Sequence, residues 1–238
     1  IGVVSAGDTV GLGDDADSFT YQALTGAASI VDGGSDSDTL VVGAGGSALT
    51  IDFSSTNDQI AAETGSYRNF ENLAAGSATV DLTVTTGNSG GLIVTGSGDD
   101  DVTVSAANDD VSTGAGDDII NVTAATLNSA IGAGGNTGVG DTLNVLGGGT
   151  LGMSVTAVGI ENVSLAVATN FTANALSGLR ITGSAGDDTI TVGAGDQVIG
   201  GAGGDDVIKV SDALLSGSLS VDGGAANSSD TLQVTSDA

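Results

Sequence analysis

Residues 183–209 place a glycine–aspartate cluster and then an aliphatic residue at intervals of nine residues. They read GSAGDDTIT, VGAGDQVIG and GAGGDDVIK. Carboxylates stacked at such a spacing repel one another unless a positive charge lies between them. The sequence supplies few such charges, because its basic residues are Arg68, Arg180 and Lys209. The chemistry that this pattern favours is therefore the binding of cations from the medium.

The composition is strongly acidic and rich in glycine. The 238 residues include 27 Asp, 3 Glu and 41 Gly, carry a formal net charge of -27, and contain no Pro, Cys or His. Without Cys or His, disulfides, thiolate or imidazole metal sites and imidazole-based triads are excluded. The charge argues against nucleic acid as a partner, and we expect no membrane insertion. Disorder is the plainest interpretation, but a mean hydropathy of +0.27 argues for a folded aliphatic core.

The sequence also repeats with a long period of roughly 90 residues. Residues 94–127 align with residues 181–215, and both lead to a matched ending, GDTLNV (140–145) and SDTLQV (229–234). A looser copy contains VDGGSDSDTLVV (31–42), and YRNFENLAAG (67–76) is similar to AVGIENVSLA (157–166). We predict an irregular first repeat at 1–92, a second at 93–179 and a truncated third at 180–238, and we interpret the chain as a piece of a longer array.

Within each repeat the fine period is nine, which fits neither a helical face nor a lone strand. When the key acid is counted as position six, an apolar residue recurs at position eight. These position-eight residues are Val10, Phe19, Val102, Val111, Ile120, Ile190, Ile199 and Ile208. The pattern predicts strands of about three residues joined by six-residue glycine-rich turns, two units forming one coil of an all-β, right-handed parallel β-solenoid. The position-eight side chains then stack inside as a ladder.

The nonapeptides resemble the G-G-x-G-x-D-x-U-x repeat of the RTX family, the calcium-binding β-roll. GGAGGDDVI, GSAGDDTIT and TGAGDDIIN carry the likeness. With the SDTL-type endings and the FEN and IEN segments, the organisation is similar to the C-terminal repeat region of bacterial RTX-type surface-layer (S-layer) proteins. The resemblance is weak in 43–93 and 146–179. It implies several Ca²⁺ ions as cofactors, held by carboxylates and by backbone carbonyls of the turns.

Aspartates one full coil apart are expected to lie side by side. Asp100 with Asp118, and Asp188 with Asp206, are 18 residues apart and should hold the best-formed ions. Opposite them, Gln197 departs from the motif, so we expect a weak or missing site there. The full set of predicted calcium ligands is Asp8, Asp17, Asp32, Asp38, Asp100, Asp109, Asp118, Asp141, Asp188, Asp206, Asp222 and Asp230.

Simpler interpretations remain for these motifs. Each aspartate could be a solvated turn residue, because Asp and Gly favour turns with or without a metal. The FEN and IEN segments, at 70–72 and 160–162, could form polar turns or contact a partner. The glycine-rich fragments do not predict a phosphate cradle, since no helix or lysine follows them. Paired carboxylates could hydrolyse glycosides, but pairs are inevitable among 30 acids and aromatic platforms are scarce, so we predict no enzyme.

The sequence therefore favours a structural role. We expect a secreted component of a bacterial surface layer that folds and self-assembles on binding calcium. The RTX resemblance implies type I secretion to the cell surface, and contact with a cell-surface polysaccharide through regions outside this chain. Extracellular calcium modules have Kd values of ~10⁻⁴–10⁻³ M, so such a chain would fold only after export. The alternatives are an extender or adhesion region of an RTX adhesin, and the RTX tail of a secreted enzyme or toxin.

Overall fold

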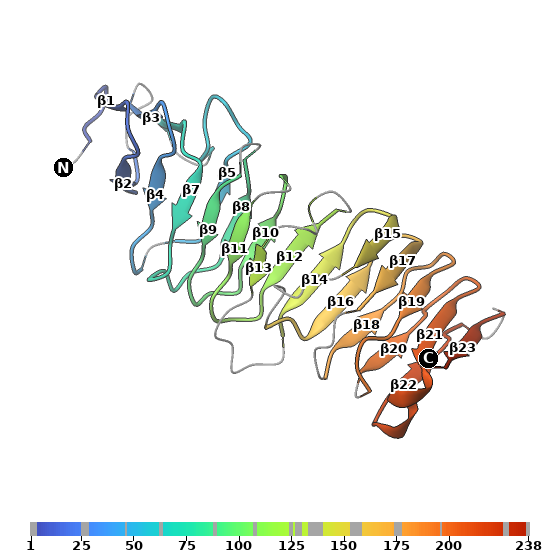
Figure 1. Ribbon diagram of the computed structural model, residues 1–238. Coiled ribbons are helices and arrows are strands. Elements are labelled where there is room, and N and C mark those ends of the chain that lie inside the picture. Colours follow the sequence, from blue (N-terminus) through green and yellow to red (C-terminus); the bar gives the residue numbers. More distant parts are fainter. Residues whose placement is uncertain are drawn as a thin grey trace.

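The protein is an elongated parallel β-solenoid, with its two ends far apart (Figure 1). The structure is a computed structural model that describes residues 4–24, 29–45, 47–61, 64–87, 90–106, 109–123, 126, 130–132, 140–152, 159–173, 178–195, 197–225 and 229–236. Among these residues, the only helix is the short 3₁₀ turn η1 (Asp212–Ser216), and none could cross a membrane. The predicted all-β parallel solenoid is confirmed.

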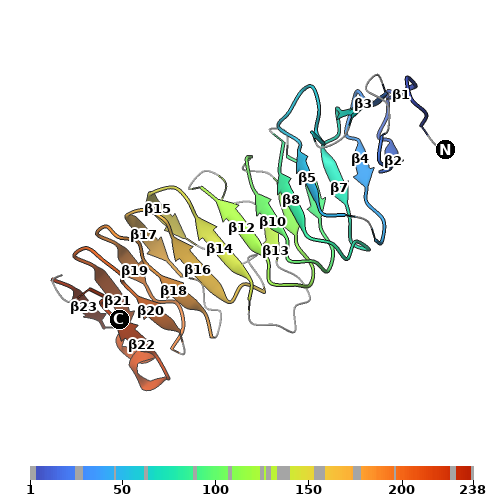
Figure 2. The ribbon, with the colours of Figure 1, turned by 180° about the vertical axis from the view of Figure 1, so that it is seen from behind.

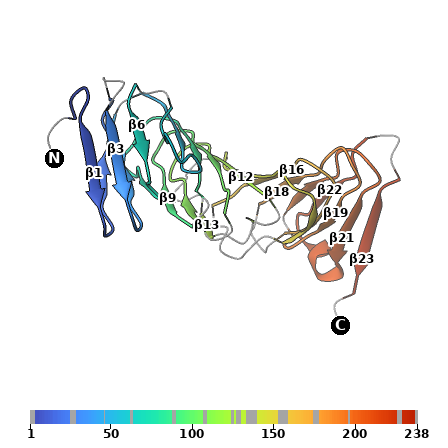
Figure 3. The same ribbon diagram turned by 90° about the horizontal axis from the view of Figure 1, so that it is seen from above.

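The described strands form four sheets, and neighbouring strands in each sheet are parallel. Sheet A contains β1 (Thr9–Gly13), β3 (Ile30–Gly34) and β6 (Ser66–Arg68), which lie side by side at the N-terminal end (Figure 3). Sheet B contains β2 (Ser18–Thr20), β4 (Thr39–Val41), β7 (Asn72–Ala74), β9 (Leu92–Val94), β11 (Asp110–Ser112) and β13 (Ala130–Gly132).

Sheet C runs through most of the molecule, and sheet D accompanies it toward the C-terminal end (Figure 2). Sheet C contains β5 (Leu49–Asp52), β8 (Leu82–Thr85), β10 (Asp101–Thr103), β12 (Ile119–Val122), β14 (Thr142–Val145), β16 (Asn162–Leu165), β18 (Arg180–Thr182), β20 (Val198–Gly200) and β22 (Ser220–Asp222). Sheet D contains β15 (Gly149–Gly152), β17 (Thr169–Thr172), β19 (Thr189–Thr191), β21 (Val207–Ser211) and β23 (Thr231–Thr235). From β7 onward, strands of sheet C alternate along the chain with strands of sheet B or D, so one strand of each makes a coil.

The position-eight side chains form the predicted ladder. Val102 pairs in register with Ile120, and Ile190 pairs with Ile208, so one coil takes 18 residues where the nonapeptides are regular. All these side chains except Val10 are buried, and Val10 at the N-terminal end is half-buried. Each buried aliphatic side chain contributes about 1.5–3 kcal/mol. In the first coils Phe19, Tyr67 and Phe70 extend the ladder, with ring centroids 6.1 and 6.4 Å apart.

The long repeat changes sheets between its second and third copies. Residues 101–103 and 189–191 are equivalent in sequence, yet β10 belongs to sheet C and β19 to sheet D. Eight described strands, an even number, lie between β10 and β19 while successive strands alternate between sheets, so the third copy is half a coil out of phase with the second. Sheet C itself continues across the predicted repeat boundaries near 92 and 179. The three repeats are therefore segments of one solenoid.

Candidate metal centres

The position-six aspartates of the regular nonapeptides are buried. Asp100 and Asp188 are 1% exposed, and Asp109, Asp118 and Asp206 are fully buried. Each lies at the end of a turn, immediately before or at the start of a strand, and its side chain points into the solenoid. The interpretation of these aspartates as solvated turn residues is therefore wrong. Because a buried carboxylate is costly unless it is hydrogen-bonded or paired, each needs a partner inside the coil.

Backbone N–H groups of the preceding coil are the first such partners. Asp100 accepts a hydrogen bond at Oδ1 from the N–H of Leu82 (2.8 Å), and Asp118 accepts one from the N–H of Asp100 (2.8 Å). The N–H of Asp118 donates to Oδ1 of Asp141 (2.9 Å), and that of Asp141 donates to Oε2 of Glu161 (3.2 Å). Column 2, defined as Asp100, Asp118, Asp141 and Glu161, thus forms a continuous chain of carboxylates along the turns that lead into sheet C.

Two further columns repeat this geometry. In column 1 (Asp17, Asp38 and Glu71), the N–H of Asp17 donates to Oδ1 of Asp38 and the N–H of Asp38 donates to Oε2 of Glu71, both at 2.8 Å.

In column 3 (Asp188, Asp206 and Asp230), the N–H of Asp188 donates to Oδ1 of Asp206 (2.8 Å), whose own N–H donates to Oδ1 of Asp230 (3.0 Å). The predicted neighbours one coil apart are confirmed.

Each column contains a flanked aspartate whose second oxygen is buried without a hydrogen bond. These atoms are Oδ2 of Asp38, Asp118 and Asp206. Each belongs to a residue flanked on both sides by other members of its column. Such a fully buried carboxylate oxygen carries a large desolvation cost, which a bound cation would remove.

Backbone oxygens lie beside two of these atoms. A Cβ placed on Gly201 would be 2.3 Å from both Oδ2 of Asp206 and the carbonyl oxygen of Gly223. A Cβ on Gly33 would be 2.7 Å from Oδ2 of Asp38 and 2.0 Å from the carbonyl oxygen of Asn69. Glycine is required at 33 and 201 because any side chain would collide with these converging oxygens.

Asp118 has a hydroxyl in place of that glycine. The Thr113 side chain faces the Asp118 carboxylate, yet neither Oγ1 of Thr113 nor Oδ2 of Asp118 forms a hydrogen bond of ordinary geometry. Both atoms are buried. The hydroxyl oxygen can also present a lone pair to a cation, so this position offers two oxygen ligands, Oγ1 of Thr113 and Oδ2 of Asp118.

Burial and mutual repulsion raise the proton affinity of the columns. Burial, the largest cause, raises the pKa of Asp206 above 3.8, and the nearby charges of Asp188 and Asp230 raise it further. Burial likewise raises the pKa of Asp118, with repulsion from Asp99 and Asp117 added. The same direction, with burial as the largest cause, holds for Asp38, Glu71, Asp100 and Glu161. The columns therefore attract positive charge, either as protons or as metal ions.

Exposed aspartates also lie in lines beside columns 2 and 3, and these lines were not predicted from the sequence. At position five, the N–H of Asp99 donates to Oδ1 of Asp81 (3.0 Å) and that of Asp117 donates to Oδ1 of Asp99 (2.9 Å). The N–H of Asp205 donates to Oδ1 of Asp187 in the same way (2.8 Å). The doubled Asp of the GDD turns carries this signal, although the sequence pattern predicted only its second residue as a ligand.

Other predicted ligands have protein partners at both carboxylate oxygens. Arg68 binds Oδ2 of Asp32 at 2.7 Å, and the amide of Asn69 donates to its Oδ1 (2.7 Å). Asp109 accepts from the N–H of Gly91 (2.9 Å) at Oδ1 and from the N–H of Ala106 (3.1 Å) and the Thr86 hydroxyl at Oδ2.

Asp188 accepts at Oδ1 from the N–H of Thr169 (2.6 Å) and at Oδ2 from the N–H and hydroxyl of Ser184. The partners of Asp32, Asp109 and Asp188 therefore favour a structural role for these three carboxylates.

The remaining predicted ligands lie near the ends of the solenoid. Asp8 is exposed and accepts from the N–H of Ser5 (2.8 Å), and Asp222 is exposed and accepts from the N–H of Gly224 (3.0 Å). Gln197, where a weak or missing site was expected, is buried, and its Oε1 accepts from the N–H of Gly193 (3.0 Å). A neutral amide thus serves at position six as a turn acceptor.

The oxygen atoms around Asp38, Asp118 and Asp206 fit the ligand preferences of calcium. Ca²⁺ prefers six to eight oxygens, including carbonyls, with flexible geometry. Across the described parts of the chain, no three acidic side chains form a group that could hold a metal by themselves. A calcium ion here would therefore be held by one or two carboxylates together with backbone carbonyls or a hydroxyl.

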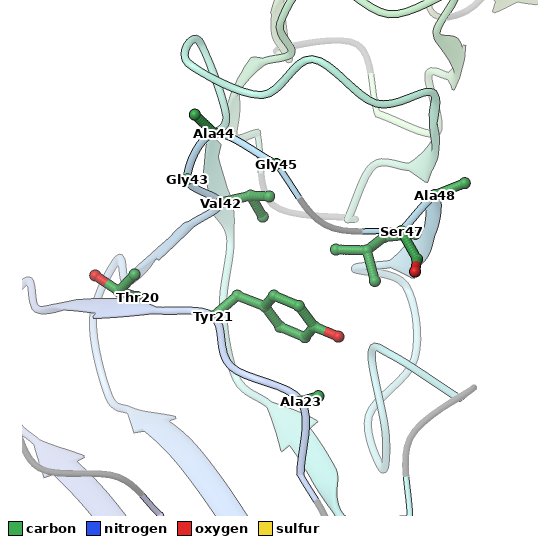
Figure 4. A pocket seen from close by; sticks show the side chains of 10 residues that line it. Thr20, Tyr21, Ala23, Val42, Gly43, Ala44, Gly45, Ser47 and Ala48 are labelled. Carbon is green, nitrogen blue, oxygen red and sulfur yellow. The ribbon is translucent and has the colours of Figure 1, made fainter.

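A separate cavity lies between residues 20–23 and the 42–49 segment (Figure 4). Its volume is about 570 Å³, and the Tyr21 ring points into it. Among the described residues that line it, none is acidic or basic, and most are small and apolar. The described lining of this cavity offers mainly apolar contacts.

The chain matches no protein-family model, no curated protein and no solved structure.

Proposed function

We propose that the chain is a structural rod of a secreted bacterial surface layer, stabilised by calcium ions bound within its aspartate columns. The observation that supports this most strongly is the buried Oδ2 atom without a hydrogen bond at Asp38, Asp118 and Asp206. A chain that needed only turn acceptors would be served by amides, as it is at Gln197. The retained charge favours a cation.

Asp206 with the Gly223 carbonyl, Asp38 with the Asn69 carbonyl, and Asp118 with Thr113 would hold the ions. A bound ion supplies two positive charges where neighbouring carboxylates repel one another. Because the folded state alone brings these oxygens together, binding stabilises it by RT ln(1 + [L]/Kd) for each site. The folded state would therefore be only weakly stable in calcium-poor cytoplasm and more stable outside the cell.

The surface-layer role is supported by the RTX resemblance and by a surface charge suited to bridging between copies by further calcium ions. The elongated shape also favours the alternative role of an extender in an adhesin (Figure 1). Sedimentation with added calcium separates the two roles. A lattice former grows into large sheets visible by electron microscopy, whereas an extender stays monomeric.

The decisive experiment is a far-UV circular dichroism titration with calcium from an EDTA-treated start at pH 7.5, with magnesium as the comparison. We expect β signal and thermal stability to rise with calcium in the millimolar range and much less with magnesium. Each site of Kd about 1 mM adds about 1.4 kcal/mol at 10 mM calcium. Equal stability in EDTA and in calcium would contradict the proposal.

A matched pair of variants tests whether calcium binds at column 3. Asp206→Asn removes the charge at a buried oxygen, whereas Asp205→Asn removes an adjacent exposed charge. We expect Asp206→Asn to stabilise the metal-free protein. We also expect calcium to stabilise this variant less than the parent chain, by about the contribution of one site. Asp205→Asn should keep most of it. If both variants respond to calcium like the parent chain, column 3 is not the binding site.

A further inference from the structure

The number of sheets in a coil changes near the FEN segment at residues 70–72. The coils built from β3–β5 and from β6–β8 place one strand in each of sheets A, B and C. From β9 onward the described coils contain strands of two sheets, because β6 is the last described strand of sheet A. The coil therefore loses one side directly after β6.

A cavity of about 160 Å³ lies just after β6 and is partly open to solvent. Its walls come from three places in the chain, which are residues 53–56 with Gln59, residues 69–71, and Gly87. Phe53 and Phe70 are buried and form its floor, whereas most of the other wall residues are polar. Glu71 carries the only charge among the described residues that line it.

Hydrogen bonds hold the walls of this cavity in place. The buried Gln59 side chain donates from Nε2 to the carbonyl of Phe70 (2.9 Å) and accepts at Oε1 from the N–H of Phe70 (3.1 Å). Asp52 accepts at Oδ1 from the N–H (3.0 Å) and from the hydroxyl (2.5 Å) of Ser54. The loop after β5 is thus fixed against the turn after β6, so the cavity is preformed.

Several polar groups of the walls are left for a ligand. Thr56 is exposed, and its hydroxyl has no hydrogen-bond partner among the described residues. The Ser55 hydroxyl accepts from the N–H of Asp58 (3.3 Å) and keeps its hydrogen for another acceptor. Glu71 accepts from the N–H of Asp38 at Oε2 (2.8 Å), which leaves Oε1 to accept from a ligand.

These groups suit a small molecule with several hydroxyls and no negative charge. The volume equals that of about five water molecules, which is too large for a bare ion and too small for a peptide strand. An anion would be repelled, because Glu71 lines the cavity and Asp52 and Asp58 lie in its loop. Sugar hydroxyls can donate to a carboxylate and exchange hydrogen bonds with serine and threonine hydroxyls, while the C–H face of the ring packs on the phenylalanine floor.

We propose that this cavity binds one sugar residue without an acidic group, such as the end residue of a cell-surface glycan. The FEN segment then has a second role beside its place in column 1, because Phe70 supplies part of the floor and Glu71 supplies the carboxylate. This inference goes beyond the proposed function, since it concerns a ligand of the cavity and not the ions in the columns.

The test titrates the whole chain in calcium buffer with the methyl glycosides of glucose, galactose, mannose and glucosamine, and binding is followed by saturation-transfer-difference NMR. We expect saturable binding of at least one glycoside in the millimolar range. The corresponding uronic acid should bind at least tenfold more weakly, because its carboxylate faces that of Glu71.

Two variants and a matched control test whether the sugar lies in this cavity. Thr56→Val removes an exposed hydroxyl and keeps the shape of the side chain, and Glu71→Gln removes the carboxylate. Each should weaken binding at least fivefold. Glu161→Gln removes the equivalent charge from column 2, where Glu161 accepts from the N–H of Asp141, and should bind the glycoside like the parent chain. Circular dichroism verifies that all three variants keep their β signal.

The outcomes separate this inference from the calcium proposal. Failure of all four glycosides to bind, or binding that is unchanged in both Thr56→Val and Glu71→Gln, would overturn it. A chain that binds a glycoside in this way but gains no stability from calcium would support it and contradict the proposed function alone.

Discussion

At position six the two oxygens of one carboxylate have different surroundings. One carboxylate oxygen accepts a backbone N–H from the neighbouring coil, as at Asp118 and Asp206, and so orders the turn. An amide can do the ordering alone, because Gln197 is buried and accepts an N–H of its own turn. Hydrogen bonding alone therefore does not require the negative charge at Asp118 and Asp206. The desolvation cost of that charge is explained if the turn binds a cation.

Position two of the turn gives a prediction on backbone strain. Ala202 has a φ of +75°, and its equivalent in the second repeat, Gly114, has a φ of +97°. Because a left-handed conformation costs a side chain about 1–2 kcal/mol and glycine loses about 0.5–1 in entropy, Ala202→Gly should stabilise by about 0.5–1 kcal/mol. Gly114→Ala should destabilise by more, since its Cβ would be 2.1 Å from the Gly96 carbonyl. Urea unfolding in calcium measures both, and a loss of stability in Ala202→Gly would contradict this reasoning.

At the scale of elements, the strands repeat the same inside–outside alternation. In β12, Ile120 is fully buried in the ladder while its neighbour Ile119 is 41% exposed. Ile120→Ala should cost about 2–5 kcal/mol, because it opens a cavity between coils that cannot collapse. Ile119→Ala should change stability by less than about 0.5 kcal/mol. Denaturant unfolding of both variants tests the predicted ladder, and equal effects would contradict it.

The ladder was predictable because a nine-residue period fixes which side chains face inward. Val102 and Ile120 could be placed from sequence alone, and so could the proximity of Asp100 to Asp118. Burial of the aspartates was not predictable, because Asp favours solvated turns and only the packed coil shows where the carboxylate points. The roles of Glu71 and Glu161 as the last acceptors of their columns depend on the coil that follows, across insertions that interrupt the nine-residue count.

At the scale of the whole molecule, the solenoid behaves as a one-dimensional stack in which each coil contacts its neighbours. Leu232 and Val234 of β23 are exposed, whereas the corresponding Leu143 and Val145 in the middle of the stack are buried. Charge is also distributed along the rod. In the described residues the only ion pair is Asp32–Arg68, against a net charge of -27 for the chain. Because that pair is partly exposed, it contributes only about 0–1 kcal/mol. Among the described residues, no arginine or lysine forms an ion pair with Asp38, Asp118 or Asp206.

The metal-free protein should therefore become more stable as the pH falls from neutral. The pKa values of Asp38, Asp100, Asp118, Asp206, Glu71 and Glu161 are raised in the folded state, chiefly by burial. The folded chain then binds more protons than the unfolded chain, so stability is fully present below the ordinary carboxyl pKa of about 4 and is lost as pH rises through the folded values. Loss of self-repulsion acts in the same direction.

The measurement is the urea midpoint in EDTA at pH 7.5 and at pH 5, which is still above the isoelectric point near 4.1. We expect a higher midpoint at pH 5, and we expect calcium to raise the midpoint more at pH 7.5 than at pH 5, because protons and calcium compete for the same buried carboxylates. Repeating the comparison with Asp206→Asn should shrink the pH effect. A midpoint in EDTA that is highest at pH 7.5 would mean that the columns are stable as bare carboxylates, and that no cation is needed to hold the coils together.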